Sequence, residues 1–279
     1  MRVSYFGHEG SFAHEIAQKA YPNAVAFLPG LTIKGVLDTL YRHKADCGVV
    51  PIENSSGGII TDSIDALISP KFIRSKNRIQ EELILPIHLN LMSNIPLRQI
   101  RTVYSHPIPL SFLALWLRRH LPHARQVSTG STAEGALFAK RDSCGAAIAT
   151  QLAANLYGLK ILSVQLPQQP NQTSFYSIAR KPIQRGPAER MAICFGLPNR
   201  PGSLVKLLTV FGNQNINLTR ITSRPLLKRN RRFSPHEYVF WVDFEGNPAS
   251  NHIQTALREA RHAVAFLDII GAYCRRKLA

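Results

Sequence analysis

Short apolar runs alternate with amphipathic segments through the first 180 residues, and this alternation constrains the fold more than any other feature of the chain. Strands are predicted at residues 3–6, 47–52, 83–92, 102–104 and 146–149, and helices at residues 11–20, 61–68, 109–119 and 151–157, the last ended by Gly158. Strands that alternate with helices are typical of a parallel sheet whose faces are covered by helices. We therefore expect an α/β fold in this region.

A polar segment containing proline and glycine, residues 181–187, predicts a linker between a domain at residues 1–180 and a second domain at residues 188–279. The second domain has the order strand, helix, strand, strand, helix, strand. Its strands are predicted at residues 191–195, 218–224, 238–244 and 266–273, and its helices at residues 203–213 and 252–262. That order indicates a ferredoxin-like βαββαβ fold.

The charge balance raises the question of a nucleic-acid partner. Lys and Arg number 34 against 17 Asp and Glu, a formal net charge of +17. The dense basic clusters are residues 228–232, expected in a hairpin turn, and residues 275–277. Neither has the interleaved aromatic residues that a base-stacking surface requires, so we expect solvated surface and no nucleic-acid partner.

Cysteine usage and hydropathy bear on the compartment. Cys47, Cys144, Cys194 and Cys274 are far apart and form no C-x-x-C pair, so neither a disulfide framework nor a zinc site is expected. A strand is expected from Val3 onward, without the long apolar core of a signal peptide, and no apolar run reaches the length of a bilayer span. These features predict a cytoplasmic protein with no membrane partner.

Four turns rich in Gly, Ser and Thr follow or precede the predicted elements in a way that favours anion binding. They lie at residues 10–12, 53–57, 105–107 and 130–133. A helix that begins at such a turn offers unpaired N–H groups and the positive end of its dipole. Any single turn is more often an ordinary helix cap, but four at the carboxyl edge of a parallel sheet would form a site for a small polyanion.

The same turns resemble the motifs of prephenate dehydratases. Residues 7–12 (GHEGSF) look like the opening motif of that family, and residues 48–55 (GVVPIENS), with Gly57, Gly58 and Asp65, resemble its most recognisable block. Four further motifs follow in the family's order: residues 105–107 (SHP), 131–134 (STAE), 157–159 (YGL) and 171–175 (NQTSF). The resemblance covers nearly the whole chain and implies a two-lobed catalytic domain similar to periplasmic binding proteins.

The implied reaction converts prephenate to phenylpyruvate with loss of water and carbon dioxide, a carbon–oxygen lyase step of L-phenylalanine biosynthesis that requires no metal and no other cofactor. The protein must hold a dianion and donate a hydrogen bond to the departing hydroxyl. The resemblance assigns that donor to Thr173, which could instead be only a strand-end hydroxyl. The other implied catalytic residues are Glu53, Asn54 and Ser55, and the implied substrate-binding residues are Ser11, Ser105, His106, Ser131, Thr132 and Phe175. Glu53 could instead be a carboxylate at the start of a helix, and His106 could have no role beyond fixing the shape of its turn.

The second domain is similar to an ACT regulatory domain, which implies L-phenylalanine as an effector and a homodimer or homotetramer. The implied effector-binding residues are Gly202, Ser203, Leu204 and Val205 in one motif and Ser223, Arg224 and Pro225 in the other. Here Ser203 and Thr222 replace the family's alanine and glutamate, which predicts weaker inhibition.

Two departures concern the catalytic motifs. Ser174 replaces the family's arginine, and Ile108 and Pro109 replace a glutamine and an alanine. Restoring the arginine by Ser174→Arg is expected to increase kcat/KM, because a guanidinium offers a carboxylate two donors.

Three other functions remain open at this level. The first is decarboxylation of prephenate without dehydration, the second is a non-catalytic amino-acid sensor, and the third is RNA binding. Incubation with prephenate, with phenylpyruvate and carbon dioxide both measured, separates the two enzymatic functions from the other two.

Overall fold

The computed structural model of the chain describes residues 1–162, 166–167, 170–183, 185–225 and 238–278; the basic residues 228–232 lie outside these ranges. The chain forms two compact units. Unit 1 comprises Met1–Ile60, Leu83–Phe175 and the end of the chain from Lys277, and unit 2 comprises Thr61–Glu82 and Tyr176–Arg276. The segment Thr61–Glu82 therefore packs with residues that follow it by more than ninety positions.

The first sheet of unit 1 is built around β1 (Arg2–Phe6), which pairs in parallel with β2 (Ala26–Gly30) and β3 (Cys47–Asn54). The short β4 (Gly58–Ile59) runs antiparallel to the end of β3, and β10 (Gln172–Ala179) is the neighbour of β3 on its other side. Two helices, α1 (Phe12–Ala20) and α2 (Ile33–Tyr41), bury their apolar faces in this unit. Strands and helices alternate as the sequence predicts.

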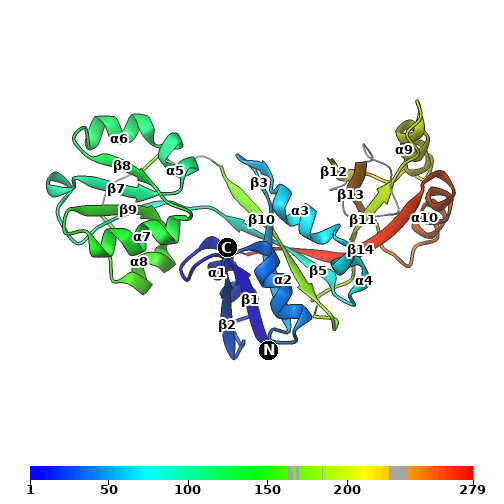
Figure 1. Cartoon of the computed structure of the whole chain (residues 1–279), viewed down its shortest axis with the longest axis horizontal. Helices are drawn as coiled ribbons and strands as arrows, with labels where there is room; N and C mark the ends of the chain where they lie inside the picture. Colours follow the sequence, from blue (N-terminus) through cyan, green and yellow to red (C-terminus); the bar gives the residue numbers. More distant parts are fainter. Residues whose placement is uncertain (163–165, 168–169, 184, 226–237, 279) are drawn as a thin grey trace. The chain divides into compact units, whose positions relative to one another are not determined.

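The second sheet of unit 1 has the order β6-β9-β7-β8, with bounds Asn90–Met92, Gly145–Ala149, Thr102–Ser105 and Arg125–Ser128. In Figure 1, α5 (Pro107–Phe112) and α6 (Ala114–His120) cover one face, and α7 (Thr132–Arg141) and α8 (Gln151–Tyr157) cover the other. The alternation of side chains along β9 explains the two faces, since Ala146 and Ile148 pack in one apolar cluster and Ala147 and Ala149 in another.

Two expected elements of unit 1 are divided in the structure. The single strand predicted at residues 83–92 is wrong: β5 (Arg78–Pro86) ends at Pro86, and β6 belongs to the other sheet. Pro86 has no N–H for a ladder bond, so the chain leaves the strand there. The helix predicted at residues 109–119 is likewise interrupted, at Leu113 (φ −92°, ψ 6°). The expected end of α8 at Gly158 is confirmed by its left-handed φ of 65°.

Unit 2 has the predicted ferredoxin-like order. β11 (Arg190–Gly196) pairs antiparallel with β13 (Tyr238–Glu245) and β14 (Phe266–Lys277), and β13 pairs antiparallel with β12 (Leu218–Pro225). The helices α9 (Ser203–Asn213) and α10 (Asn251–Ala263) bury one face each against the apolar side of these strands. The segment that precedes β5 adds α3 (Thr61–Leu67) and α4 (Pro70–Arg74) to this unit.

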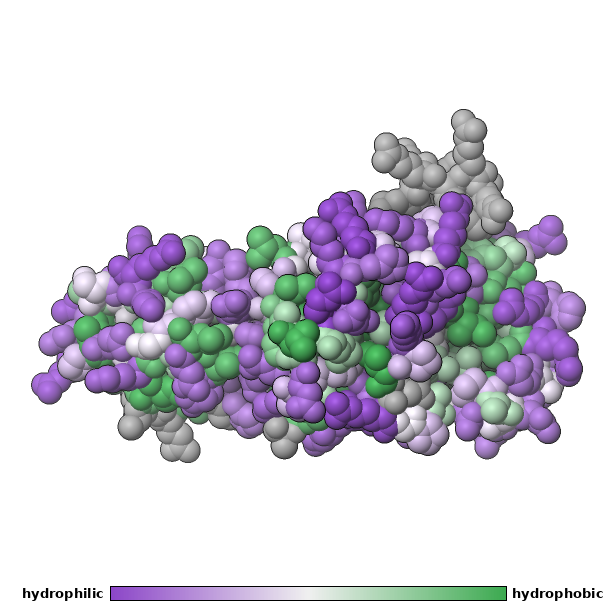
Figure 2. All heavy atoms as spheres, turned by 90° about the horizontal axis from the view of Figure 1, so that it is seen from below, coloured by the Kyte–Doolittle hydropathy of each residue, from purple (hydrophilic) through white to green (hydrophobic). Residues whose placement is uncertain are grey.

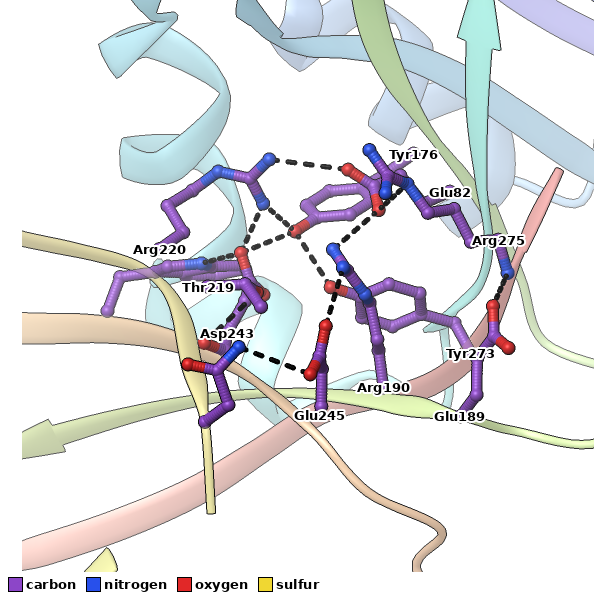
Figure 3. Close-up of polar contacts among 12 residues, drawn as sticks. Glu82, Tyr176, Glu189, Arg190, Thr219, Arg220, Asp243, Glu245, Tyr273 and Arg275 are labelled. Atoms are coloured by element: carbon purple, nitrogen blue, oxygen red, sulfur yellow. Dashed lines mark hydrogen bonds and ion pairs between the residues drawn. The ribbon is translucent and has the colours of Figure 1, made fainter. Parts of the chain in front are cut away.

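A buried group of charged and phenolic side chains lies inside unit 2, and we call Glu82, Tyr176, Arg220, Asp243 and Tyr273 the ionic cluster (Figure 3). The Arg220 guanidinium forms ion pairs with Glu82, at 3.3 Å, and with Asp243, and the three side chains are 6%, 1% and 0% exposed. Tyr176 donates to Asp243 Oδ2 at 2.8 Å. Burial raises the pKa of Tyr176 and Tyr273 well above the usual value, so both hydroxyls stay protonated.

Figure 2 shows a face on which hydrophilic residues surround smaller groups of hydrophobic ones. Among the helices of the described residues, none is both long and apolar enough to cross a membrane.

Candidate active site

Unit 1 contains a cavity of about 510 Å³ at the ends of its strands and the beginnings of its helices. All four of the predicted anion-binding turns contribute to its lining. The predicted site residues that line it are Ser11, Asn54, His106, Ser131, Thr132, Thr173 and Phe175. The structure thus brings together residues that are separated by more than 160 positions in the sequence.

Three predicted site residues do not line the cavity. Ser105 is fully buried, and its hydroxyl donates to the Ile148 carbonyl oxygen at 2.7 Å, which ties β7 to β9. Glu53 is half-buried at the end of β3. Ser55 accepts a hydrogen bond from the Gln172 N–H at 3.0 Å and donates to Asn171 Oδ1 at 3.1 Å. Ser105 and Ser55 thus hold neighbouring segments in place through these bonds rather than forming the lining.

The lining of the cavity contains three linked side chains, Asn54, Asn171 and Thr173, which we call the amide cluster. Asn54 Oδ1 accepts from the backbone N–H groups of Ser56, at 3.0 Å, and Gly57, at 2.8 Å. Backbone N–H groups can only donate, so the orientation of the Asn54 amide is fixed. Its Nδ2 therefore donates, to Asn171 Oδ1 at 2.8 Å and to Thr173 Oγ1 at 2.9 Å. Thr173 is the acceptor in that bond, which leaves its own hydroxyl proton for another partner.

Two of the predicted serines serve as helix caps. Ser11 Oγ accepts from the His14 N–H at the start of α1, and Ser131 Oγ accepts from the Glu134 N–H at the start of α7. Glu134 in turn accepts from the N–H of Gly130, the residue before the cap, at 2.6 Å, which fastens the turn to the start of α7. These bonds set the direction in which the first N–H groups of both helices face.

His106 begins α5, where its Nδ1 accepts from the Ile108 N–H at 3.4 Å. Burial lowers the pKa of His106, so the imidazole is neutral near pH 7. A neutral ring that accepts at Nδ1 carries its proton on Nε2. His106 can therefore present an N–H donor in the cavity that it lines.

The rest of the lining is largely apolar. Its large apolar side chains are Phe6, Phe12, Leu31, Ile60, Ile87, Leu89, Ile108 and Phe112, and its further polar side chains are His8, Ser56, Glu134 and Asn171. A site with a few fixed polar groups and extensive apolar walls is suited to a ligand that has both a hydrocarbon ring and polar substituents. Ser174, the position of a family arginine, is buried and lies on β10 between Thr173 and Phe175, which both line the cavity, whereas Ser174 does not.

The predicted effector motifs lie at the start of α9 and at the end of β12, both in unit 2. Gly202 adopts a left-handed φ of 81° directly before α9, where Val205 is 66% exposed. Arg224, near the end of β12, forms a two-point ion pair with Asp65 of α3, through Nε at 2.6 Å and Nη2 at 2.7 Å. This hydrogen bonding raises the pKa of Arg224.

Sequence reasoning missed two residues of these sites. Asn171 is the first residue of the NQTSF motif and lines the cavity, but it was not among the predicted residues. Asp65 belongs to a recognised motif, yet its partner Arg224 is 159 positions away. Motif membership was the signal that could have pointed to both.

Comparison with known proteins identifies the family. The family model for prephenate dehydratase matches residues 3–183, and that for the ACT domain matches residues 192–262. This chain belongs to the prephenate dehydratase family. It is therefore a carbon–oxygen lyase that converts prephenate to phenylpyruvate, and the predicted family, enzyme class and two-part α/β fold are confirmed.

Three relatives illustrate the family membership. Prephenate dehydratase of Amycolatopsis methanolica is 32% identical over 278 residues, covering 98% of this chain and 88% of that protein. Arogenate dehydratase/prephenate dehydratase 2 of Arabidopsis thaliana is 34% identical, covering 98% of this chain and 72% of that protein. The crystal structure of prephenate dehydratase from Arthrobacter aurescens in complex with L-Phe has a TM-score of 0.85 at 27% identity, covering 99% of this chain and 90% of that one.

Proposed function

We propose that the cavity of unit 1 is the site of prephenate dehydration and that Thr173 donates the hydrogen bond that assists departure of the ring hydroxyl. The observation that carries this proposal is the bond from Asn54 Nδ2 to Thr173 Oγ1. Because that bond occupies a lone pair of the hydroxyl, the proton of Thr173 is left to donate. Among the described residues, no acceptor for this proton is found, and Thr173 lines the cavity.

The two carboxylates of the substrate need donors other than Thr173. The starts of α1 and α7, capped by Ser11 and Ser131, supply N–H groups and the positive ends of two helix dipoles, and Thr132 adds a hydroxyl. The neutral imidazole of His106 supplies a further N–H. The apolar walls, with Phe175 among them, keep water from the carboxylate that leaves as carbon dioxide.

The remaining predicted catalytic residues act in this proposal through others. Both protons of the Asn54 amide are engaged, so Asn54 positions Thr173 rather than binding a carboxylate itself. Ser55 fastens the segment that carries Asn171 and Thr173, and Ser105 holds β7 in register with β9. Glu53 belongs to the strand end that presents Asn54.

Regulation by L-phenylalanine is the second part of the proposal. The relative from Arthrobacter aurescens was crystallised with L-Phe, and the two effector motifs of this chain open α9 and end β12. We place the ligand at residues 202–205 and 223–225, in a homodimer or homotetramer of ACT domains. A ligand that favours one arrangement of the chain lowers activity only through its differential affinity for that arrangement.

The proposed domain boundaries are residues 1–180 and 188–279, joined by residues 181–187. Glu81 and Glu82 are buried and have basic partners in residues 190–276, so a truncation after Arg180 would leave two buried carboxylates without their ion pairs. Experiments on regulation therefore require the intact chain. We place the protein in the cytoplasm, in keeping with its four free thiols.

The test incubates the purified intact chain with prephenate near neutral pH and measures phenylpyruvate and carbon dioxide together. Equal amounts of both products, unchanged by a metal chelator, are expected. Carbon dioxide without phenylpyruvate would favour decarboxylation without dehydration, and no turnover with ligand binding would favour a sensor. Calorimetric titration with L-phenylalanine tests the regulatory part, and arogenate assayed in parallel tests the substrate range.

A further inference from the structure

The amide cluster fixes a second donor beside Thr173. Asn171 Oδ1 accepts from two groups, Asn54 Nδ2 at 2.8 Å and Ser55 Oγ at 3.1 Å. The orientation of the Asn54 amide is fixed by two backbone N–H groups, so the Asn171 atom that it contacts has to be the oxygen. Asn171 Nδ2 therefore faces away from both partners. Within the described residues it has no acceptor, although the side chain lines the cavity.

The backbone around Asn171 holds this donor in place. The Asn171 carbonyl oxygen accepts from the Ile87 N–H at 2.8 Å. The next residue, Gln172, accepts from the Ser55 N–H at 2.9 Å and donates to Ser55 Oγ at 3.0 Å. A side chain fastened at its own oxygen and on both sides of its backbone loses little freedom when a ligand binds.

The side chains of Asn171 and Thr173 both line the cavity and meet at one atom of Asn54. Thr173 Oγ1 and Asn171 Oδ1 both accept from the single nitrogen Asn54 Nδ2, so the two side-chain ends flank one atom. Each then has one donor group left, the Thr173 hydroxyl and the Asn171 amide. Two donors on neighbouring side chains of one cavity can together stabilise negative charge as it develops on a single oxygen.

We propose that Asn171 is a catalytic residue whose Nδ2 donates a second hydrogen bond to the departing hydroxyl oxygen; this inference rests on the proposed function of the cavity. In the reaction, the electron pair of the bond to the carboxylate carbon enters the ring as carbon dioxide leaves. The electron pair of the carbon–oxygen bond departs with the hydroxyl, and one proton from solvent completes the water. Asn171 and Thr173 stabilise the charge on that oxygen while the bond breaks.

The decisive variant is Asn171→Asp. An aspartate retains the shape and the oxygen that accepts from Asn54 and Ser55, but its ionised form has lost the N–H donor. We expect kcat for prephenate to fall roughly 100-fold, as on removal of one oxyanion-type donor. Because a protonated aspartic acid can donate again, kcat of the variant should recover as the pH is lowered through the pKa of the new carboxyl, whereas wild-type kcat should not rise.

The matched control is Asn23→Asp, which makes the same change of charge at an exposed turn residue outside the cavity and should leave kcat unchanged. A purely structural role for Asn171 predicts wild-type kcat in Asn171→Asp, because both bracing bonds are kept, and that result would overturn the inference. A rise in KM with unchanged kcat would also overturn it, since it would assign the amide to a substrate carboxylate. Wild-type protein that leaves prephenate unchanged would instead refute the proposed function itself.

Discussion

The amide cluster of unit 1 and the ionic cluster of unit 2 both hold polar groups away from bulk water, but they do so with opposite chemistry. The amide cluster is neutral, and its hydrogen bonds leave the Thr173 hydroxyl and the Asn171 amide with donors to offer. The ionic cluster is charged, and Arg220 is engaged at once by Glu82, Asp243 and Tyr176. The first contributes to the lining of a cavity, whereas the second is enclosed.

The contrast follows from the cost of desolvation. A charge that is removed from water has to be compensated by partners in the folded protein, so a buried ion group engages its donors internally. A neutral amide or hydroxyl that lacks one hydrogen bond at a cavity surface destabilises the folded protein less than an unpaired charge does, because a ligand or water can complete the bond. A site for a dianion can therefore be lined by neutral donors, while the enclosed charges of the ionic cluster are compensated within unit 2.

The largest expected effect is on stability, from Arg220→Met. Methionine keeps much of the volume of the side chain but leaves Asp243 buried without its ion pair, while Glu82 keeps its pairs with Arg190 and Arg275. Removing one partner of a buried ion group costs about 3–5 kcal/mol, and the loss should be measured as a lower free energy of unfolding in urea. Arg2→Met is the matched control: its pair with Asp46 is about half exposed on both sides, and a loss below about 1 kcal/mol is expected. Equal losses in the two variants would contradict the distinction between enclosed and exposed pairs.

The next effect is on catalysis, from Thr173→Val. Valine keeps the volume and removes the hydroxyl, so kcat should fall by a factor corresponding to about 2–4 kcal/mol of transition-state stabilisation, with a much smaller change in KM. The free energy of unfolding should change by less than it does in Arg220→Met, because the amide cluster carries no charge. Thr39→Val, on α2 outside the cavity, is the control and should keep wild-type kcat. A near-normal kcat in Thr173→Val would move the donor role to another residue.

Ser174→Arg should reverse the expectation drawn from the sequence alone. Ser174 is only 7% exposed and lies between two residues that line the cavity, on a strand whose side chains alternate in direction. An arginine there would overpack a buried position and bring in an unpaired charge, so we expect a loss of about 1–3 kcal/mol in the free energy of unfolding and no gain in kcat/KM. Ser143→Arg, at an exposed position, should change neither quantity. An increase in kcat/KM for Ser174→Arg would show that the side chain does reach the substrate.

Features governed by a few consecutive residues could be predicted from the sequence. Ser11 and Ser131 cap helices, and Gly158 ends α8, because each depends on the three or four residues beside it. The same local signals located the turns that line the cavity. The strand predicted at residues 83–92 was wrong because the apolar pattern continues across Pro86 although the chain changes sheets there.

Features that join distant segments could not be predicted in this way. Asn54 and Thr173 are 119 positions apart, and Arg220 and Glu82 are 138 positions apart, so no local pattern contains either bond. Sequence alone could not show that both protons of the Asn54 amide are engaged inside the protein, because their acceptors, Asn171 and Thr173, are more than a hundred positions away. The position of a motif identifies a site. The role of each residue within that site depends on the hydrogen bonds that its side chain already makes in the folded protein.

The smallest expected effect is on the pH dependence of stability. It comes from His106, which lines the same cavity as the amide cluster but, unlike those neutral side chains, can take up a proton. Burial lowers the pKa of His106 in the folded protein below the value of about 6.5 for an unfolded chain. As the pH falls through that value, the unfolded chain takes up the proton first, so the free energy of unfolding decreases. The decrease ends below the folded pKa, where both states are protonated. Burial lowers the pKa of His14 as well, so His14 adds a contribution of the same sign.

The variant His106→Asn separates the contribution of His106 to this pH dependence from that of His14. Asparagine can cap α5 through its Oδ1, as His106 does through Nδ1, but it does not titrate in this range. We measure the free energy of unfolding in urea between neutral and acidic pH. It should therefore fall less steeply for the variant than for the wild type, and the remaining decrease should be the contribution of His14. One proton limits the difference in slope to about 1.4 kcal/mol per pH unit. A slope identical to that of the wild type would mean that His106 titrates equally in the folded and unfolded chains, and that its ring is as open to water as it is in a peptide.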